Sequence, residues 1–456
     1  MRQTAFLGTE PIGSLLLRLS LPAMVGMLVQ ASYNIVDAFF IGWGVGPMGL
    51  AGTAVAFPLH FFVMGIATMG GVGAASLVSR SLGAGDVERA DRALGTLVTL
   101  ALVTGVSAAV LGRAFLPQLL ALLGAKGEIL PYAGTYIGII LFGIPFHVLG
   151  VGLNNAVRAE GNARVAMFTM LISAGVNTVL DPLFIFGFGW GIAGAAWATV
   201  IAQALVVAWL GNYVFSGRSA LKLKAGHLVP RMDIIRQITA VGASEFARLT
   251  ASGFTATIVI HSLGRFGSPL AVAAYGVIAR VLSVFFMPMM GISQGLQPVL
   301  GYNYGAGLWG RAHRAIRLSV VAATVISTAG FLVLLLFPGS IFGIFTADPE
   351  LRAIGARSLR FMTLGFAFIG FQVIGSTIFQ ALGKAGPALF LSMSRQVLLF
   401  LPLVVVLPRL LGLPGVWLAF PAADILSALV TFGFFSRQMR ELCRLETGPS
   451  CGDLPG

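Results

Sequence analysis

Acidic and amide side chains stand at helical spacing inside the apolar stretches of the first half of this sequence. Gln30, Asn34 and Asp37 are four and three residues apart, and Asn177 and Asp181 are four apart. Residues at these spacings share one face of a helix, so each set should present its oxygen atoms in one direction. Ionisable groups are costly inside a lipid bilayer, and each one therefore suggests a functional role.

The two aspartates are expected at one depth. Asp37 and Asp181 each stand five or six residues before the end of an apolar stretch that runs in the same direction, roughly 8 Å at 1.5 Å per residue. Two carboxylates at one depth could share a cavity and hold a proton between them. Alternatively, Asp37, Asn177 and Asp181 could hold a sodium ion, since hard cations prefer oxygen ligands. Thr199 and Gln203, again four apart, add polar groups in the next stretch.

The elements that must position these residues are membrane-spanning helices. The chain has 456 residues, of which 57% are hydrophobic and only 10% charged, and its mean hydropathy is +0.92. Soluble domains carry roughly a quarter charged residues. Apolar runs of about 20 residues read as spans, because the backbone must satisfy its own hydrogen bonds in lipid. Twelve are predicted, at 15–42, 50–79, 93–116, 131–157, 165–187, 191–215, 235–263, 270–301, 315–338, 353–380, 387–408 and 413–436.

The basic net charge of +13 indicates topology rather than nucleic-acid binding. Most lysines and arginines fall between spans on the side of the N-terminus, which is the bias of cytoplasmic loops. Both termini are therefore predicted in the cytoplasm, with the chain a multi-pass protein of an inner membrane. No short signal-peptide pattern is seen at the start, so the first span is expected to remain.

The chain contains a long internal repeat. GAGDVERADRA at 83–93 returns as GAGLWGRAHRA at 305–315, and GIAGAAWATVIAQAL at 191–205 aligns with GLPGVWLAFPAADIL at 412–426. Six spans per unit is an even number, so both units enter the bilayer in the same direction, related by a pseudo-twofold axis along the membrane normal. The predicted organisation is an all-α protein with an N-terminal six-helix bundle (1–215), a cytoplasmic linker (216–234), a C-terminal six-helix bundle (235–436) and a cytoplasmic tail (437–456).

The second half carries different charges. Glu245 and Arg248 are three apart and are expected to form an ion pair, whereas Arg280 and Asp424 could pair across the bundle or line a central cleft. His60, His147 and His261 stand alone on apolar stretches and are expected to be ordinary core residues. The residues that could line a substrate cavity are Gln30, Asn34, Gln203, Glu245, Arg248, Arg280 and Asp424.

A site for a proton or a sodium ion is predicted in the first half of the chain alone. The positions 222 residues beyond Asp37 and Asp181 are Val259 and Leu403, so the repeat does not duplicate the acids. The predicted spans contain no cysteine, paired-histidine motif or HExxH motif, which argues against an enzyme and against a bound cofactor.

Four segments carry a resemblance to a known family: QASYNIVDAFFIG (30–42), SRSLGAGDVERADRA (79–93), RAEGNAR (158–164) and NTVLDPLFIFGFGWGIAGAAWATVIAQ (177–203). They resemble the multidrug and toxic compound extrusion (MATE) family, and the similarity spans essentially the whole chain. The resemblance implies two six-helix lobes in a V around a central cavity. It also implies an antiporter that expels amphipathic, often cationic, compounds in exchange for protons or sodium ions.

Within that family the DinF-like branch is the one the N-terminal residues resemble. By this resemblance the coupling site consists of Asp37, Asn177, Asp181, Asn154 and Thr199. A two-acid site in the second lobe, as in the NorM-like branch, is not matched, because the tenth span offers Gln372 and Gln380 rather than an acid.

The expected function is therefore multidrug efflux by alternating access, with small organic molecules and the lipid bilayer as partners and the chain working as a monomer. The alternative is a flippase for lipids or lipid-linked oligosaccharides, which should line its cavity with several basic residues. Arg248 and Arg280 are the only candidates for that role. The residues alone leave open whether the coupling ion is H⁺ or Na⁺.

Overall fold

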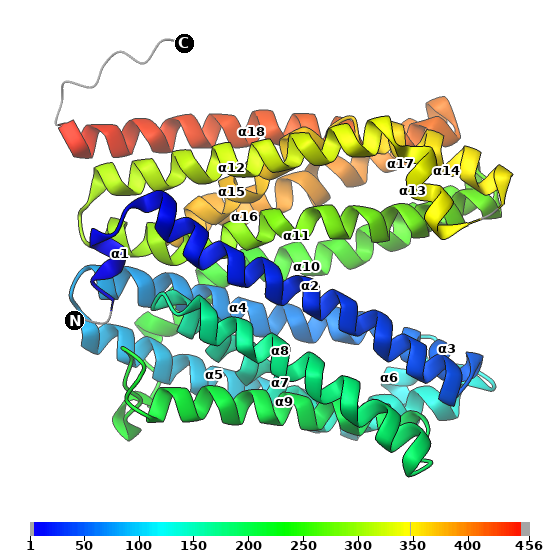
Figure 1. The fold of residues 1–456 in the computed structure, drawn as a ribbon, viewed down its shortest axis with the longest axis horizontal. Coiled ribbons are helices and arrows are strands. Elements are labelled where there is room, and N and C mark those ends of the chain that lie inside the picture. Colours follow the sequence, from blue (N-terminus) through cyan, green and yellow to red (C-terminus); the bar gives the residue numbers. More distant parts are fainter. Residues whose placement is uncertain (1–3, 347, 448–456) are drawn as a thin grey trace.

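The computed structural model describes residues 4–346 and 348–447, and within these it is helical with no strand. Two bundles lie side by side (Figure 1). The first, here the N-lobe, consists of α1 (Phe6–Thr9), α2 (Ile12–Gly44), α3 (Pro47–Val55), α4 (Phe57–Gly83), α5 (Val87–Ala114), α6 (Leu116–Leu122), α7 (Ile129–Ala159), α8 (Ala163–Pro182), the π-helix η1 (Leu183–Gly187) and α9 (Ile192–Phe215).

The second bundle, the C-lobe, follows a short 3₁₀ turn, η2 (Ala225–His227). It consists of α10 (Met232–Phe266), α11 (Pro269–Gly305), α12 (Trp309–Leu336), α13 (Pro338–Phe345), α14 (Pro349–Met362), η3 (Phe366–Phe368), α15 (Ile369–Ala381), α16 (Ala385–Met393), the π-helix η4 (Ser394–Phe400), α17 (Leu401–Leu411) and α18 (Leu413–Thr447).

These helices account for the twelve predicted spans. By length and composition ten helical segments of the described chain could cross a membrane, and the pair Pro349–Met362 and Phe366–Ala381, bent by 48°, makes an eleventh. The twelfth, predicted at 235–263, is α10, a helix of 35 residues that carries Glu245, Arg248 and several hydroxyl side chains. The predicted span 50–79 is interrupted by a turn at Ala56, where α3 ends and α4 begins.

The internal repeat is visible in the backbone. Gly85 and Gly307, 222 residues apart, have φ of +78° and +70°, and Gly161 and Gly383, also 222 apart, have +93° and +73°. Left-handed φ values favour glycine, so equivalent turns in the two lobes depend on the same residue type. In the N-lobe these turns are followed by capping side chains. Asp86 accepts a hydrogen bond from the Arg89 amide at 3.0 Å and so begins α5.

The two lobes touch closely at one end of the molecule, here the closed end. There α4 crosses α11 so tightly that a Cβ on Gly83 would lie 2.0 Å from the Tyr302 carbonyl oxygen. The repeat-related contact, from Gly305 to the Arg80 carbonyl oxygen, would be 2.1 Å. Only glycine permits this approach of two backbones, which is the usual way helices pack closely in lipid.

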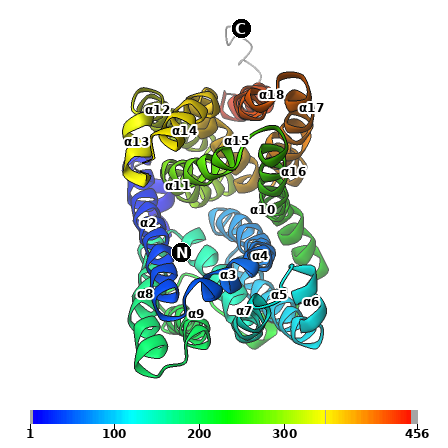
Figure 2. The same cartoon turned by 90° about the vertical axis from the view of Figure 1, so that its right-hand side faces the viewer.

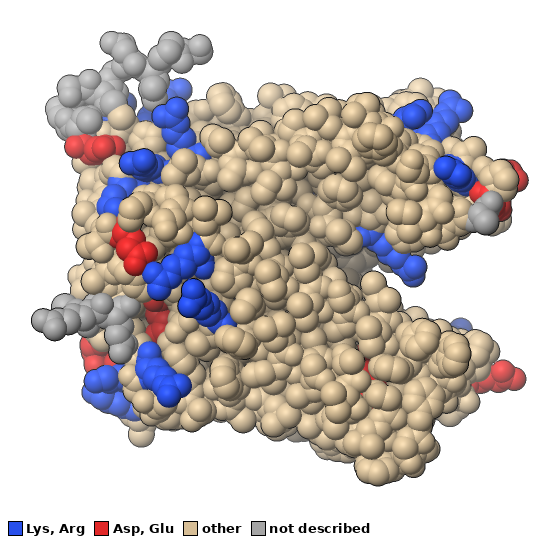
Figure 3. Space-filling model, in the orientation of Figure 1, with Lys and Arg blue, Asp and Glu red and all other residues tan. Residues whose placement is uncertain are grey.

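At the opposite end, here the open end, the lobes separate. Figure 2 views the molecule from the open end, and Figure 3 shows a deep notch between the lobes there. Both α1 and the last turns of α18 lie at the closed end (Figure 1), and many of the Lys and Arg side chains on the face in Figure 3 gather there too. The molecule is thus a V whose cleft opens away from the helices that begin and end the described chain.

The predicted linker is a packed strap rather than a loose connection. Residues 216–231 lie against the closed end of the N-lobe, where the Ser219 hydroxyl donates to Glu160 at 2.8 Å and the Lys222 amide donates to Asp91 at 2.7 Å. The C-terminal bundle begins at residue 232, three residues before the predicted boundary. Residues 437–447 of the predicted tail continue α18, and 448–456 lie outside the described residues.

Candidate functional site

The structure brings Asp37 and Asp181 together. Helices α2 and α8 run side by side in the same direction, with Gly26 against Met170 and Gly44 against Ile185 and Phe186. This register puts Asp37 level with Asp181, and their side chains interact directly. Asp181 is fully buried. The two side chains thus meet at one depth, as their helical spacing and positions predict, while their role in ion coupling stays a prediction.

The helix that carries Asp181 changes its geometry directly after that residue. Pro182 lacks a backbone N–H and cannot continue the helical hydrogen-bond ladder. The chain passes into the π-helix η1, whose wider turns cover Leu183–Gly187. Short π segments often occur at functional sites, because they redirect side chains without ending the helix.

Four further polar side chains surround the two carboxyl groups. Tyr33 stands one turn before Asp37 and interacts with the Thr199 side chain, and the carboxylates act electrostatically on both Tyr33 and Tyr136. Asn177 is one turn before Asp181, almost fully buried, and donates to the Ser173 carbonyl oxygen at 3.1 Å. We call Tyr33, Asp37, Tyr136, Asn177, Asp181 and Thr199 the carboxylate cluster.

Sequence reasoning missed the two tyrosines. Tyr33 had a signal, because it lies four residues before Asp37 and therefore shares its helix face. Tyr136 had none, since α7 reaches the cluster only through the tertiary packing of the N-lobe.

The carboxylate cluster contains more hydrogen-bond acceptors than donors. Both oxygens of Asp181, Oδ1 of Asp37 and Oδ1 of Asn177 are buried and have no hydrogen-bond partner among the described residues. Buried polar atoms are nearly always paired, and an unpaired carboxylate is especially costly. The arrangement therefore suits a ligand that brings positive charge or donors: a proton shared by the carboxyl groups, or a cation held by their oxygens.

Asn154 does not belong to this cluster, contrary to the expectation. Its Nδ2 donates to Thr169 at 2.6 Å and to the Ala166 carbonyl oxygen at 2.9 Å, and its Oδ1 accepts from Arg158. Thr169 and Asp181 are twelve residues apart on α8, about 18 Å along the helix axis. Asn154 thus lies near the closed end, because α7 carries it well beyond the cluster, and there it ties α7 to α8.

The remaining N-lobe candidates lie around the cluster. Asn34 is exposed and Gln30 is half-buried, both on α2. Gln203 is one turn from Thr199 on α9, and its side-chain nitrogen lies 3.5 Å from His147 Nδ1. These positions are compatible with a cavity wall, and that role stays a prediction.

In the C-lobe the predicted ion pair is present. Arg248 donates to Glu245 Oε2 at 3.0 Å through Nε and at 2.5 Å through Nη2. Gln380 on α15 donates to Glu245 Oε1 at 2.9 Å. The carboxylate of Glu245 is therefore fully paired, in contrast to those of the N-lobe.

Asp424 does not pair with Arg280 or line the cleft. It is buried in α18 and accepts from Arg395 Nε at 2.5 Å, while Arg280 is exposed on α11. Arg395 stands in the π-helix η4, within the predicted span 387–408. Its guanidinium is partly exposed, and the buried Asp424 carboxylate compensates its charge.

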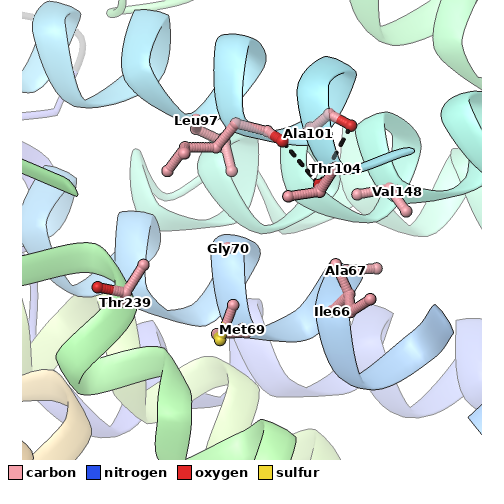
Figure 4. A pocket seen from close by; sticks show the side chains of 10 residues that line it. Ile66, Ala67, Met69, Gly70, Leu97, Ala101, Thr104, Val148 and Thr239 are labelled. Carbon is pink, nitrogen blue, oxygen red and sulfur yellow. Dashed lines mark hydrogen bonds between the residues drawn. The ribbon is translucent and has the colours of Figure 1, made fainter. Parts of the chain in front are cut away.

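Two hollows flank the N-lobe. A cavity of about 80 Å³ lies between α4, α5, α7 and α10 (Figure 4). Its lining is apolar. The hydroxyl of the lining residue Thr104 does not add polarity, because it donates to the Leu100 carbonyl oxygen at 2.6 Å. It is too small for a drug-sized ligand. A wider hollow of about 440 Å³ at the open end is lined by residues that include Val45, Tyr132, Thr135 and Ile192. It lies at the ends of α2 and α9 and so stands over the carboxylate cluster.

The described residues contain no group of three or more His, Cys, Asp or Glu side chains that could hold a metal ion.

The model of the MatE family matches residues 22–183 of this chain and again residues 245–406. The two matches begin 223 residues apart, close to the offset of the internal repeat.

Relatives cover nearly the full chain. It is 28% identical over 426 residues to the multidrug export protein MepA of Staphylococcus haemolyticus, covering 93% of this chain and 94% of the relative. It is 26% identical over 427 residues to MepA of Staphylococcus aureus, covering 94% of each.

Solved structures agree. A multidrug resistance MATE family transporter described in its outward-facing conformation is 26% identical and superimposes with a TM-score of 0.90, over 97% of this chain and 99% of that one. A transporter of the same superfamily from Pyrococcus furiosus, described as having a binding pocket of reverse polarity, is 26% identical with a TM-score of 0.89, over 98% and 99%. The matching proteins are transporters and not enzymes, and this chain belongs to the MatE family of multidrug and toxic compound extrusion transporters.

Proposed function

We propose that this protein is an efflux antiporter that exports amphipathic or cationic organic compounds in exchange for protons or sodium ions. Asp37 and Asp181 are the coupling carboxylates, and Asn177 and Thr199 supply further oxygens. The DinF-like branch of the family is the one this arrangement fits, since the acids without partners lie in the N-lobe.

The observation that carries the proposal is the set of unpaired acceptors in the carboxylate cluster. Two interacting carboxyl groups whose oxygens lack donors bind a proton or a cation more readily than either group alone. In the C-lobe, by contrast, Glu245 and Asp424 are each neutralised by an arginine. Ion binding is therefore assigned to the N-lobe.

The shape of the molecule supports alternating access. The cleft is open at one end and sealed by the glycine contacts of α4 and α11 at the other, as expected of one of two states that rock about a central site. The relatives named for multidrug export support organic compounds as the cargo. We propose that the protein is a monomer in the inner membrane, with both termini in the cytoplasm and the cleft facing outward.

A flippase for anionic headgroups is less well supported. Of the arginines expected in the cavity, Arg248 is bound to Glu245, which leaves Arg280 as an exposed cation with no acidic partner at hydrogen-bond distance among the described residues. A single guanidinium is a poor lining for a cavity that must accept lipid-linked phosphates.

The test is transport by the purified chain in liposomes, with ethidium as an amphipathic cationic probe and a proton or a sodium gradient imposed separately. Asp37→Asn and Asp181→Asn should each abolish gradient-driven transport, because an amide neither binds a proton at these pH values nor offers a charge to sodium. Asp233→Asn, at an exposed acid that begins α10, is the matched control and should keep activity. Full transport by both cluster variants would refute the assignment.

A further inference from the structure

Arg280 on α11 carries a charge inside a span without a counter-charge. Both acids inside the spans of the C-lobe already hold an arginine, Glu245 with Arg248 and Asp424 with Arg395. Arg280 is exposed and has no acidic partner at hydrogen-bond distance among the described residues. Because a charge within a span is costly against lipid, such a side chain faces water or a ligand.

The packing of α11 against α2 sets the register of these two helices. A Cβ on Gly291 would lie 2.3 Å from Met24 Cγ, and one on Gly295 would lie 2.2 Å from Ser20 Oγ. The helices therefore run antiparallel, and four residues back along α11 correspond to four residues forward along α2. Helix α2 begins at the closed end and α11 ends there, so the register can be followed from this seam into the cleft.

Arg280 lies at the depth of the carboxylate cluster, on the face of α11 that looks across the cleft. It is eleven residues before Gly291, and Ile35 is eleven residues after Met24. Eleven residues make three helical turns, about 16 Å, so both side chains return to the faces that touch in the seam. Arg280 is exposed and Ile35 is 73% exposed, so the seam has opened between them. Asp37 is two residues beyond Ile35, about 3 Å along the axis.

Pro288, which lies within α11 between Arg280 and Gly291, does not change this orientation. Ile278 and Met289, on either side of the proline and again eleven residues apart, are both fully buried in one core cluster of the C-lobe. Ile278 is two residues from Arg280, about 200° around the helix. Helix α11 therefore keeps one face toward the core, and Arg280 stands on the other.

The cleft thus has groups of opposite charge at one depth. The N-lobe carries carboxyl oxygens that lack donors, and the C-lobe carries a guanidinium that lacks an acidic acceptor among the described residues. An arginine offers a planar fork of N–H donors that matches a carboxylate, a sulfonate or a phosphate. The exposed side chain of Ile35 adds an apolar surface beside them, which suits the body of an amphipathic compound.

We infer that Arg280 binds an anionic group of the cargo, and that the protein exports zwitterionic amphipathic compounds, which carry a carboxylate, sulfonate or phosphate as well as a positive charge. This inference rests on the function proposed above and narrows its substrate class. A purely cationic compound meets the guanidinium as a like charge, so it should be a poorer substrate than its zwitterionic counterpart.

The experiment uses two dyes that differ in one group. Rhodamine 110 carries a benzoate and a delocalised positive charge, whereas rhodamine 123 is its methyl ester and keeps only the positive charge. Transport of each dye by the full chain in liposomes is measured over a range of concentrations. Arg280→Gln should raise the KM for rhodamine 110, relative to that for rhodamine 123, by about tenfold or more, because the charge-assisted hydrogen bonds to the benzoate are lost.

Two further variants separate charge from geometry and from position. Arg280→Lys keeps the charge but not the fork and should give an intermediate ratio of KM values. Arg265→Gln is the matched control, at an exposed arginine in the last turn of α10 that lies over the Phe266 ring, and it should keep the wild-type ratio. An unchanged ratio in Arg280→Gln, or an equal loss for both dyes, would overturn the inference.

Binding of the dyes to the purified chain in detergent, followed by fluorescence anisotropy, does not depend on transport. Rhodamine 110 should bind more weakly to Arg280→Gln than to the wild type. If the wild type transports rhodamine 123 but does not bind rhodamine 110, the inference fails and the proposed function stands. If the wild type transports neither dye nor ethidium under either gradient, the proposed function fails, and equal Kd values for rhodamine 110 in the wild type and Arg280→Gln would overturn the inference as well.

Discussion

At the scale of single residues, the Glu245–Arg248 pair is the clearest case of charge compensation within a span. Removing the guanidinium in Arg248→Ala leaves a carboxylate enclosed by α10 and α15 with only Gln380 as a donor. Breaking a buried pair in this way costs about 3–5 kcal/mol. We expect the melting temperature of the purified protein in detergent to fall by several degrees.

A double variant tests whether the loss of stability comes from the unpaired carboxylate of Glu245. Glu245→Gln together with Arg248→Met removes both charges and keeps an acceptor for Gln380, so it should be more stable than Arg248→Ala. Arg231→Ala is the control, because Arg231 and Asp233 are paired at 3.1 Å but each is more than half exposed. Exposed pairs contribute less than about 1 kcal/mol. If the double variant melted below Arg248→Ala, the carboxylate left alone would not be the cause of the loss.

Residue-level prediction from the sequence succeeded where helical spacing carried the information. The Asp37–Asp181 pair and the Glu245–Arg248 pair followed from positions along a helix, since residues on one face at one depth must meet. The partner of Asp424 could not be found in this way, because Arg395 lies on another helical segment, η4, and the pairing depends on how η4 packs against α18. Asn154 shows a different limit of prediction from the sequence. The resemblance to a family matched its residue type and its position in the sequence. Its depth in the molecule depends on where along its length α7 packs against α8.

At the scale of elements, the strap of residues 216–231 holds the closed end of the N-lobe. Glu160, in the turn between α7 and α8, accepts from the Tyr213 hydroxyl at 2.5 Å and from the Ser219 hydroxyl and the Ala220 amide at 2.8 Å each. Glu160→Ala leaves three donors without their acceptor, a loss of about 1–3 kcal/mol. Brief proteinase K treatment should then cut the strap much faster than in the wild type, while Lys224→Ala, at an exposed strap residue, should not change the rate.

The same residue gives the strap a pH dependence. Burial raises the pKa of the Glu160 carboxyl above its usual value, against the opposing effect of its hydrogen bonds. A carboxyl with a raised pKa in the folded state stabilises that state fully below its unfolded pKa, and the contribution is lost as pH rises through the folded pKa. Glu160→Gln should therefore lose less stability than the wild type as pH rises above the ordinary glutamate pKa of about 4.3, measured as melting temperature at each pH. Parallel curves would contradict this account.

The elements themselves were largely predictable, because the apolar runs are long and lipid leaves the backbone few alternatives. The deviations occur where polarity or bending interrupts the run. Helix α10 was predicted as a span at 235–263 although it carries Glu245 and Arg248, and the span containing α14 and α15 is bent between Met362 and Phe366. The strap read as a polar linker because its contacts are made mostly by backbone amides and small hydroxyl groups, which have no hydropathy signature.

At the scale of the whole molecule, the repeated loop joins the two lobes at the closed end. Arg89 and Arg311 occupy equivalent positions in the two copies, and each reaches the first helix of the other half. Arg89 donates to Gln237 of α10 at 3.2 Å. Arg311 donates to the carbonyl oxygens of Glu10 at 2.6 Å and Leu7 at 3.3 Å, directly before and within the turns that lead into α2. The pseudo-symmetric frame thus carries a pair of cross-lobe contacts that must separate if the closed end is to open.

These contacts differ in strength, so their loss should not be symmetric. Arg311 is partly buried and bonds also to Asn303 at 2.9 Å, so Arg311→Ala should weaken the closed end by about 2–3 kcal/mol, whereas Arg89→Ala, at an exposed contact, should cost less than about 1 kcal/mol. Hydrogen exchange of the amides in 69–83 and 291–305 reports this opening. We expect faster exchange in Arg311→Ala and faster still in the double variant. Arg92→Ala, which breaks only the Glu88 pair within α5, should match the wild type. Equal exchange in the wild type and all four variants would show that the glycine crossing of α4 and α11 alone holds the closed end.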